Sequence, residues 1–263
     1  MNQILIVKMM IIMILTVIII KHSLNKLNKM EGKLKSTSFN CAGFKYRNFS
    51  YLKEIFKRCD IILLQETWLY NFKYSEFINI LPNCQYHAIS TMDESKVRRV
   101  GRPYGGCAIL WHRNLALTIT PVKSMSARIC SVQVKSNLFS LVIINVYMPC
   151  DDNKDNNVCM YGDVLSEISS IISLYEDDNE IIVGGNFNVD YERLDSLNLS
   201  LMKQFVTEEH LICATLPIVN NNYTRISSNG DKSFIDHILV SQGIVFDNVL
   251  YQLKVTICPI ICL

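Results

Sequence analysis

Short apolar runs, each closed by a polar residue or a glycine, recur along most of this chain. Residues 61–64, 141–144 and 181–183 are continuous runs of isoleucine, leucine and valine. Such short runs are typical of strands that are buried on both faces of a sheet. The pattern therefore predicts several buried strands, each ending where the chain turns polar.

The polar residues at these strand ends are candidates for one common site. A buried strand that stops at a tight turn, as at Gly184-Gly185, places the next side chains at the rim of its sheet. Segment 233–241 differs, because its acidic residue lies inside the strand-like run. Taken singly, Tyr147 would fit the rim of the core, and Glu66 would fit a turn or a helix cap. The candidate set is Asn40, Glu66, Tyr147, Asn186, Asn188 and Asp236.

Helix-like and hairpin-like segments lie between these runs. Apolar spacing predicts helices at 46–58, 158–175 and 199–209. Segments 105–111 and 130–134 are typical of strands, and 135–137 is typical of a hairpin turn leading into the strand at 138–147. Mixed strands and helices with several hairpins favour an α/β fold of two packed sheets with helices outside.

Composition is consistent with one globular domain. The chain has 263 residues, of which 49% are hydrophobic, and a formal net charge of +2, which neither requires nor excludes a nucleic-acid partner. Its 10 cysteines are scattered, and none forms a Cys-x-x-Cys pair. This usage indicates reduced thiols and predicts an intracellular protein, nuclear or cytoplasmic.

The N-terminal segment has a different character. Residues 9–20 are apolar apart from one threonine, which is short of the roughly 20 residues that a membrane-spanning helix needs. Two interpretations stay open: residues 4–20 are a signal anchor that holds the protein at a membrane, or residues 1–29 are translated sequence with no structural role. In both, the globular domain is expected at 34–263.

The order of the motifs resembles the endonuclease/exonuclease/phosphatase superfamily. Within it, the chain specifically resembles the apurinic-type endonuclease domain that accompanies reverse transcriptase in non-LTR retrotransposons. Any single motif is weak, but all occur in the family's order between about residues 34 and 241. The matching pieces are 39–43, 64–69, 105–109, 145–149, 184–188, 223–225 and 233–238.

The resemblance implies a four-layered α/β sandwich and a Mg²⁺-dependent phosphodiesterase, with Mn²⁺ as an alternative metal, that nicks DNA. It implies that Glu66 binds the metal with Asn40 beside it, and that Tyr147 and Asn188 hold the scissile phosphate. The family has an aspartate at position 186 that activates or orients the attacking water. Catalysis would then consist of placing that water in line and offsetting charge on the phosphate oxygens.

Further substrate contacts are implied at Thr224 and Arg225. Asp236 is expected to orient a catalytic histidine, which the family supplies from a C-terminal Ser-Asp-His segment. His237 is not a substitute, because the residue after Asp236 on a strand points to the opposite face of the sheet. The basic segment 96–102 is equally consistent with DNA phosphate contacts and with a solvated surface loop.

Two departures from the family pattern predict impaired activity. Position 186 is asparagine, and a neutral amide cannot take a proton from water; loss of a general base typically costs about 10²–10⁴ in rate. No Ser-Asp-His follows Ser241, so the domain is expected to be incomplete at its C-terminus. The alternatives are a catalytically inactive nucleic-acid-binding relic and, ranked lower, a small-molecule or lipid phosphoesterase.

Overall fold

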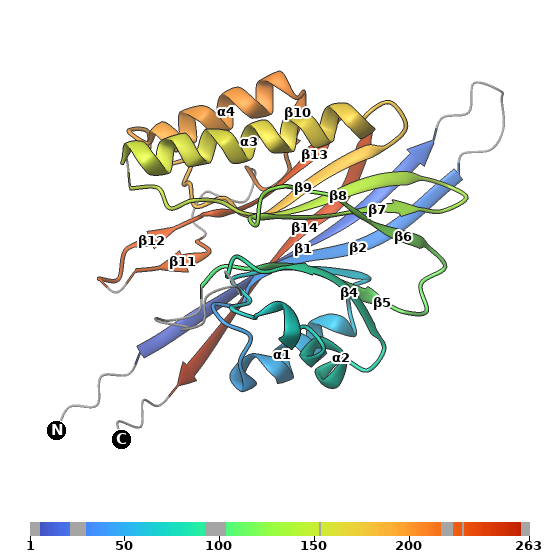
Figure 1. Cartoon of the computed structure of the whole chain (residues 1–263), viewed down its shortest axis with the longest axis horizontal. Coiled ribbons are helices and arrows are strands. Elements are labelled where there is room, and N and C mark those ends of the chain that lie inside the picture. The colour runs from blue at the N-terminus through green and yellow to red at the C-terminus, as the bar shows by residue number, and fades with distance from the viewer. Residues whose placement is uncertain are drawn as a thin grey trace.

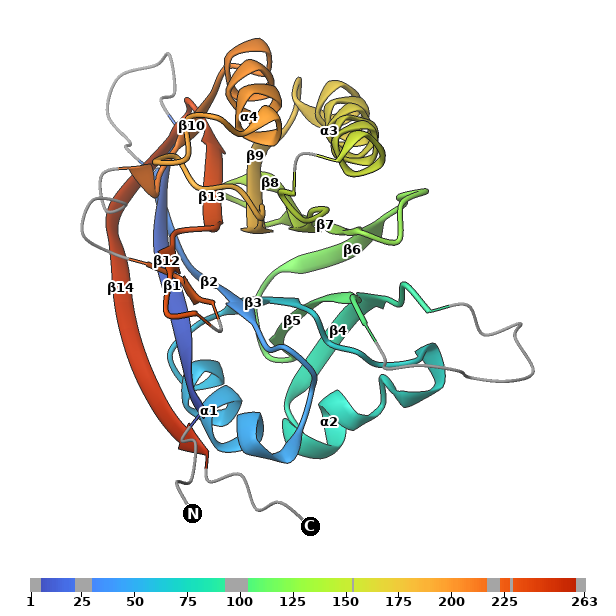
Figure 2. The ribbon, with the colours of Figure 1, turned by 90° about the vertical axis from the view of Figure 1, so that its left-hand side faces the viewer.

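Two mixed sheets lie face to face, with helices on their outer sides (Figures 1 and 2). The predicted α/β sandwich is confirmed. The basic segment at 96–102 lies outside the residues that can be described. The computed structural model describes residues 6–21, 30–92, 104–152, 154–216, 223–227 and 229–258, with the backbone alone over 6–21, 30–33 and 245–258.

The first sheet has six strands in the order β14-β1-β2-β3-β5-β4. Only β2 and β3 pair in parallel; the other neighbours are antiparallel. All five residues of β3 are buried, which explains the continuous apolar run in its sequence. The strands are β1 (Ile6–Lys21), β2 (Met30–Asn40), β3 (Ile61–Gln65), β4 (Cys84–Ile89), β5 (Cys107–His112) and β14 (Ile244–Cys258).

The second sheet also has six strands, in the order β10-β13-β9-β8-β7-β6. Here β8 and β9 are the parallel pair. The predicted hairpin turn joins β7 to β8, with Lys135 paired to Ser140. The strands are β6 (Thr118–Val122), β7 (Ile129–Lys135), β8 (Ser140–Tyr147), β9 (Glu180–Asn186), β10 (Leu211–Cys213) and β13 (Asp236–Ser241), and β11 (Arg225–Ile226) with β12 (Lys232–Ser233) forms a separate small hairpin.

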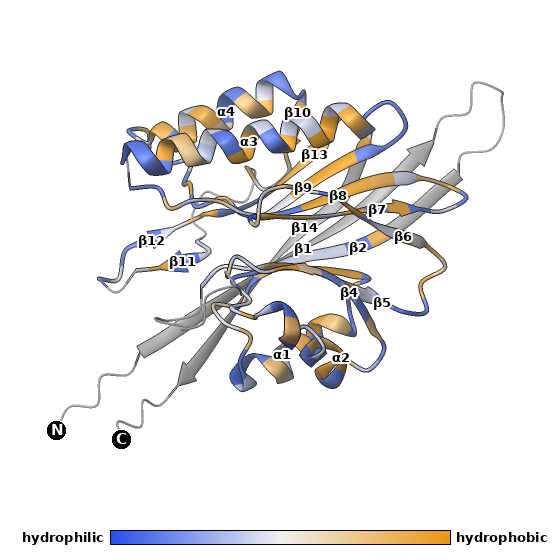
Figure 3. Ribbon diagram, viewed as in Figure 1, coloured by the Kyte–Doolittle hydropathy of each residue, from blue (hydrophilic) through white to orange (hydrophobic). Residues whose placement is uncertain are grey.

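Helices α1 and α2 cover the first sheet, and α3 and α4 cover the second (Figure 2). In Figure 3 these helices mix hydrophilic and hydrophobic positions, whereas the central strands are mostly hydrophobic. The segments predicted as helices correspond to α1, α3 and α4. The sequence did not predict the short helices η1 and α2. The helices are α1 (Tyr46–Phe56), η1 (Asn71–Lys73), α2 (Glu76–Ile80), α3 (Asp155–Tyr175) and α4 (Leu197–Glu208).

Three apolar clusters make up the core. One lies between the sheets, where Leu63 of β3 and Ile143 of β8 are both buried. Gly184 belongs to this contact: a Cβ there would lie 2.9 Å from Leu63 Cδ1, so the sheets approach too closely for a side chain. The other two clusters join the second sheet to α3 and α4 and the first sheet to α1.

The N-terminal apolar segment is a strand of the first sheet. β1 pairs antiparallel with β2 on one side and with β14 on the other. None of the helices among the described residues has both the length and the apolar composition to span a membrane. The division of the chain at residue 34 stays a prediction.

Candidate functional site at one edge of the two sheets

The predicted site residues come from strands that end at the same edge of the molecule. Asn40 ends β2 and is paired with the last residue of the parallel strand β3. Tyr147 ends β8 and is paired with Asn186, the last residue of the parallel strand β9. Asp236 begins β13, which runs antiparallel to β9, and it is also paired with Asn186. Strand pairing thus groups these residues within each sheet, and the charge of Glu66, which follows β3 of the first sheet, acts on Tyr147 and Asp236 of the second.

The Glu66 carboxylate is held by Asn40. Asn40 Nδ2 donates a hydrogen bond to Glu66 Oε1 at 2.9 Å, and Asn40 Oδ1 accepts one from the Ala42 N–H at 3.0 Å. The second bond sets the amide orientation, so its NH₂ group faces the carboxylate. Asn40 therefore orients Glu66 through a donated hydrogen bond.

The backbone at Glu66 is left-handed, with φ of 51°. Such a conformation is uncommon outside glycine and persists where the surroundings enforce it. Here two backbone hydrogen bonds fix the conformation of the loop: Gly43 N donates to Glu66 O at 2.7 Å, and Thr67 N donates to Gly106 O at 3.1 Å. This loop presents a half-buried carboxylate at the sheet edge.

The two carboxamides after β9 differ in what they contact. Asn186 is buried, and its Oδ1 accepts from the Asn188 N–H at 3.1 Å. Asn186 is paired with Asp236 across β9 and β13, and its amide acts to lower the pKa of that carboxyl group. Asn188 has φ of 55°, and its Nδ2 donates to the Met148 carbonyl at 2.8 Å. Asn188 thus links the end of β9 to the end of β8.

Asp236 is an acid with an unusual environment. The Thr224 hydroxyl oxygen accepts hydrogen bonds from the backbone N–H groups of Ile235 at 2.9 Å and of Asp236 at 3.2 Å. Asp236 Oδ1 is buried and has no hydrogen-bond partner in the described structure. Burial, reinforced by the negative charge of Glu66, raises the pKa of Asp236 to about 7, although Arg225 and hydrogen bonds from Thr224 and Asn186 oppose the shift.

Tyr147 is a neutral phenol that helps to line a cavity. Burial, followed by the nearby charge of Glu66, raises its pKa well above the ordinary value. The Arg128 guanidinium lies 5.5 Å from the ring centre and donates to the Tyr147 carbonyl at 3.1 Å. The cavity has a volume of about 340 Å³, and its lining includes Tyr104, Arg128 and Tyr147. Exposed Arg225 and buried Thr224 lie on the hairpin side of the site.

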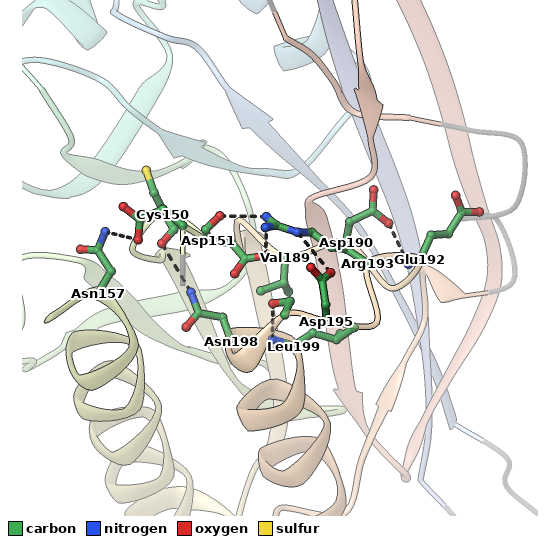
Figure 4. A network of polar contacts seen from close by, with 12 residues as sticks. Cys150, Asp151, Asn157, Val189, Asp190, Glu192, Arg193, Asp195, Asn198 and Leu199 are labelled. Atoms are coloured by element: carbon green, nitrogen blue, oxygen red, sulfur yellow. Dashed lines mark hydrogen bonds and ion pairs between the residues drawn. The ribbon is translucent and has the colours of Figure 1, made fainter. Parts of the chain in front are cut away.

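A polar network joins the loops after β8 and β9 (Figure 4). Arg193 donates to the Asp151 carbonyl at 3.0 Å and to its Oδ2 at 3.3 Å. Asn198 at the start of α4 donates to the Cys150 carbonyl at 3.4 Å. Because these loops directly follow Tyr147 and Asn188, the network holds the two residues in a fixed relation.

His237 points away from this edge. It is fully buried, and its ring nitrogens contact the Val189 carbonyl at 3.0 Å and the Thr215 hydroxyl at 3.2 Å. Since a carbonyl only accepts, Nε2 carries the proton and Nδ1 accepts from Thr215. Burial lowers the pKa of His237 to about 4, so the ring is neutral. The opposite-face orientation predicted from the sequence is what the structure has.

Gln65 and Asn145 had no predicted role, yet they join the two sheets behind the site. Asn145 Nδ2 donates to the Leu64 and Ala108 carbonyls, both at 2.9 Å, and Gln65 Nε2 donates to Asn145 Oδ1 at 2.7 Å. Both side chains are fully buried. The only signals in the sequence are that Gln65 ends one apolar run and that Asn145 interrupts another.

The donor set can accept a divalent cation. No group of three or more His, Cys, Asp or Glu residues suited to a metal occurs among the described residues. Mg²⁺ does not need one, because it commonly takes one or two carboxylates and keeps several waters. Glu66 would hold the cation, whose positive charge would also offset the negative charge that Glu66, second to burial, exerts on Asp236.

Two packed mixed sheets, with helices outside and a polar site at one edge, define the protein as an α/β sandwich. The chain belongs to the Endonuclease/Exonuclease/phosphatase family, whose model matches residues 37–253. The superfamily predicted from the motifs is confirmed. No curated protein matches the chain in sequence.

Solved structures with the same fold include three DNA-processing proteins. The 3′ phosphatase NExo from Neisseria, bound to a product DNA hairpin, is 18% identical with a TM-score of 0.58, covering 80% of this chain and 87% of that one. The AP endonuclease LMAP from Leishmania major is 12% identical with a TM-score of 0.64, covering 78% of each chain.

The endonuclease domain of TRAS1, a telomere-specific non-LTR retrotransposon, is 14% identical with a TM-score of 0.55 and covers 78% of this chain and 83% of that domain. The predicted resemblance to retrotransposon endonucleases is thus confirmed at the level of the fold. At such identities the likeness extends to the fold alone.

Proposed function

We propose that this protein is a Mg²⁺-dependent phosphodiesterase of retrotransposon origin that nicks DNA, with Mn²⁺ as an alternative metal. The convergence of five residues at one edge of the two packed sheets carries the proposal; they are Glu66, Tyr147, Asn186, Asn188 and Asp236. The family assignment and the DNA-processing activities of structural neighbours support it.

Each residue then has a role that follows from its surroundings. Glu66, oriented by Asn40, holds the divalent cation, which when bound supplies positive charge to the phosphate oxygens. Tyr147 keeps its proton, because its pKa is raised, and its hydroxyl donates a hydrogen bond to a phosphate oxygen.

Around the phosphate, the side chains of Asn188 and Thr224 supply neutral hydrogen bonds. Exposed Arg225 contributes positive charge that attracts the DNA backbone.

The test is metal-dependent nicking of supercoiled plasmid by the full chain, because β1 is part of the first sheet. We expect nicking with Mg²⁺ and none with EDTA. Glu66→Gln should lower the rate at least about 100-fold, since a metal contributes several kcal/mol to transition-state stabilisation. Glu176→Gln is the matched control, because Glu176 is exposed at the end of α3.

A folded protein that nicks in EDTA, or a Glu66→Gln variant that nicks like the wild type, would contradict the proposal. A second candidate, favoured by the amide at position 186, is an inactive DNA-binding module. It predicts no nicking at all, together with retained affinity for the same plasmid. Hydrolysis of a phosphoinositide without DNA nicking would identify a lipid phosphoesterase instead.

A further inference from the structure

The cavity beside Tyr147 has no role in the proposed chemistry. Its volume of about 340 Å³ lies within the range of about 300–1,000 Å³ that is usual for sites that bind small molecules. Its lining comes from the loop that leads into β5, from residues 126–128 ahead of β7 and from α3. Loops of both sheets thus surround it, and one of its walls is the residue proposed to bind the phosphate.

Two carboxylates and one guanidinium are the charged groups that line the cavity. Asp163 and Glu167 are four residues apart on α3, so they lie on the same face of that helix. Arg128 supplies the guanidinium. Because the balance is acidic, the cavity disfavours a second phosphate and favours a ligand that offers N–H donors to the carboxylates.

The protein itself already orients part of this charged lining. Glu167 Oε1 accepts hydrogen bonds from residues 124–126 at 2.5–3.0 Å. Arg128 donates to the Tyr147 carbonyl at 3.1 Å, and its other guanidinium N–H groups have no hydrogen-bond partner among the described residues. Asp163 is exposed and makes no hydrogen bond or ion pair with any described residue. Asp163 and Arg128 can therefore both bind a ligand.

Large apolar side chains complete the lining. Tyr104 is 63% exposed and Met160 is 40% exposed, although both border the cavity. The Thr91 hydroxyl donates to the Tyr104 carbonyl at 2.7 Å, which fixes the backbone at the aromatic residue. An exposed aromatic ring close to a phosphate site is a surface on which a nucleobase can stack.

We propose that this cavity binds a guanine base of the DNA strand held at the candidate site. The inference rests on the proposed nuclease function. Guanine has the O6 and N7 acceptors that suit the Arg128 guanidinium, together with adjacent N1–H and 2-amino donors that suit the Asp163 carboxylate. Adenine and cytosine have one amino donor each, and the single N–H of thymine lies between two carbonyl oxygens that a carboxylate repels.

A guanine in the cavity lies outside the duplex stack, because base pairing occupies its N1–H and 2-amino groups. Removing a base from the stack costs free energy, and the cost is lowest where the base is already unpaired. The cavity would therefore make cleavage depend on a guanine at one fixed distance from the nick.

Equilibrium dialysis of the full chain with radiolabelled dGMP and dIMP, in EDTA, tests the base site without catalysis. The two nucleotides share the same phosphate, and dIMP lacks only the 2-amino group. We expect the wild type to bind dGMP at least about tenfold more tightly than dIMP, because a hydrogen bond to a charged acceptor is worth about that factor. In Asp163→Asn the ratio should fall below about threefold, since the carboxylate charge is removed.

Asp178→Asn, at an exposed position outside the cavity, is the matched control and should keep the wild-type ratio. Thermal midpoints show whether each variant is folded. Equal affinity of the wild type for dGMP and dIMP overturns the inference, and inorganic phosphate that binds as tightly as either nucleotide would identify a phosphate site instead. A ratio that Asp163→Asn leaves unchanged also overturns it, because the base then lies elsewhere.

Sequencing the ends of nicked plasmid separates this inference from the proposed function. The wild type should show guanine enriched at one fixed position beside the nick, and Asp163→Asn should lose that enrichment. Nicking without any such enrichment overturns the inference alone. A folded protein that prefers dGMP to dIMP and never nicks overturns the proposed function and leaves the guanine site in place.

Discussion

Replacing Asn145 by leucine is expected to lower the free energy of unfolding by about 3–5 kcal/mol. Leucine removes the donor to two buried carbonyls, those of Leu64 and Ala108, and the acceptor for the amide of Gln65. Each buried polar group left without a partner costs about 1–3 kcal/mol. The loss should be large because all three partners lie where the two sheets meet.

Urea denaturation of the variant and the wild type measures this difference. Asn137→Leu is the matched control, because Asn137 is exposed in the β7–β8 turn and should change stability by less than about 0.5 kcal/mol. The double variant Gln65→Leu/Asn145→Leu should cost less than the sum of the single changes, since the two amides are removed together. A change under about 1 kcal/mol for Asn145→Leu would show that the amide does not join the sheets energetically.

Asp236→Asn is expected to stabilise the metal-free protein at pH 8. The pKa of Asp236 is raised to about 7, so the folded protein keeps this proton at pH values where the unfolded chain, with a pKa of about 3.9, has lost it. Between these values the folded state binds more protons than the unfolded state. Stability therefore falls as pH rises from about 4 to 7 and then levels off.

The raised pKa corresponds to a cost on the order of 2–4 kcal/mol above pH 7, at about 1.4 kcal/mol for each pKa unit. Asp236→Asn should recover most of it at pH 8 and almost nothing at pH 4. Denaturation at both pH values, in EDTA to exclude a bound cation, makes the comparison. Asp178→Asn serves as the exposed control, and an Asp236→Asn effect that is equal at both pH values would contradict the pKa assignment.

These two predictions concern the same edge of the molecule. The amides of Gln65 and Asn145 hold the sheets together behind the site, while Asp236 in front has a buried oxygen with no hydrogen-bond partner among the described residues. The cost in stability at Asp236 therefore falls on a residue of the candidate site, as is common where functional groups are buried. If Asp236→Asn is inactive and yet more stable, unfolding cannot explain its loss of activity.

Much of the architecture followed from the sequence. Continuous apolar runs predicted β3, β8 and β9, because a strand covered on both faces favours apolar side chains along most of its length. Amphipathic spacing predicted α1, α3 and α4, because a helix that covers a sheet buries its apolar face. The short segments β4, β6 and β10 were not predicted, since a few residues at a sheet edge carry little pattern.

The sequence by itself determined the fold class and the set of polar residues at the strand ends. Hydrophobic periodicity and the order of motifs can both be read directly along the chain. Only the tertiary structure decided which of these polar residues lie beside one another. Pairing of β9 with β13 set Asp236 against Asn186, and pairing of β2 with β3 set Asn40 beside Glu66. Contacts between residues far apart in sequence depend on strand register and sheet packing. The hydrogen bonds, the unpartnered oxygen of Asp236 and its raised pKa therefore emerge only when the two sheets are assembled.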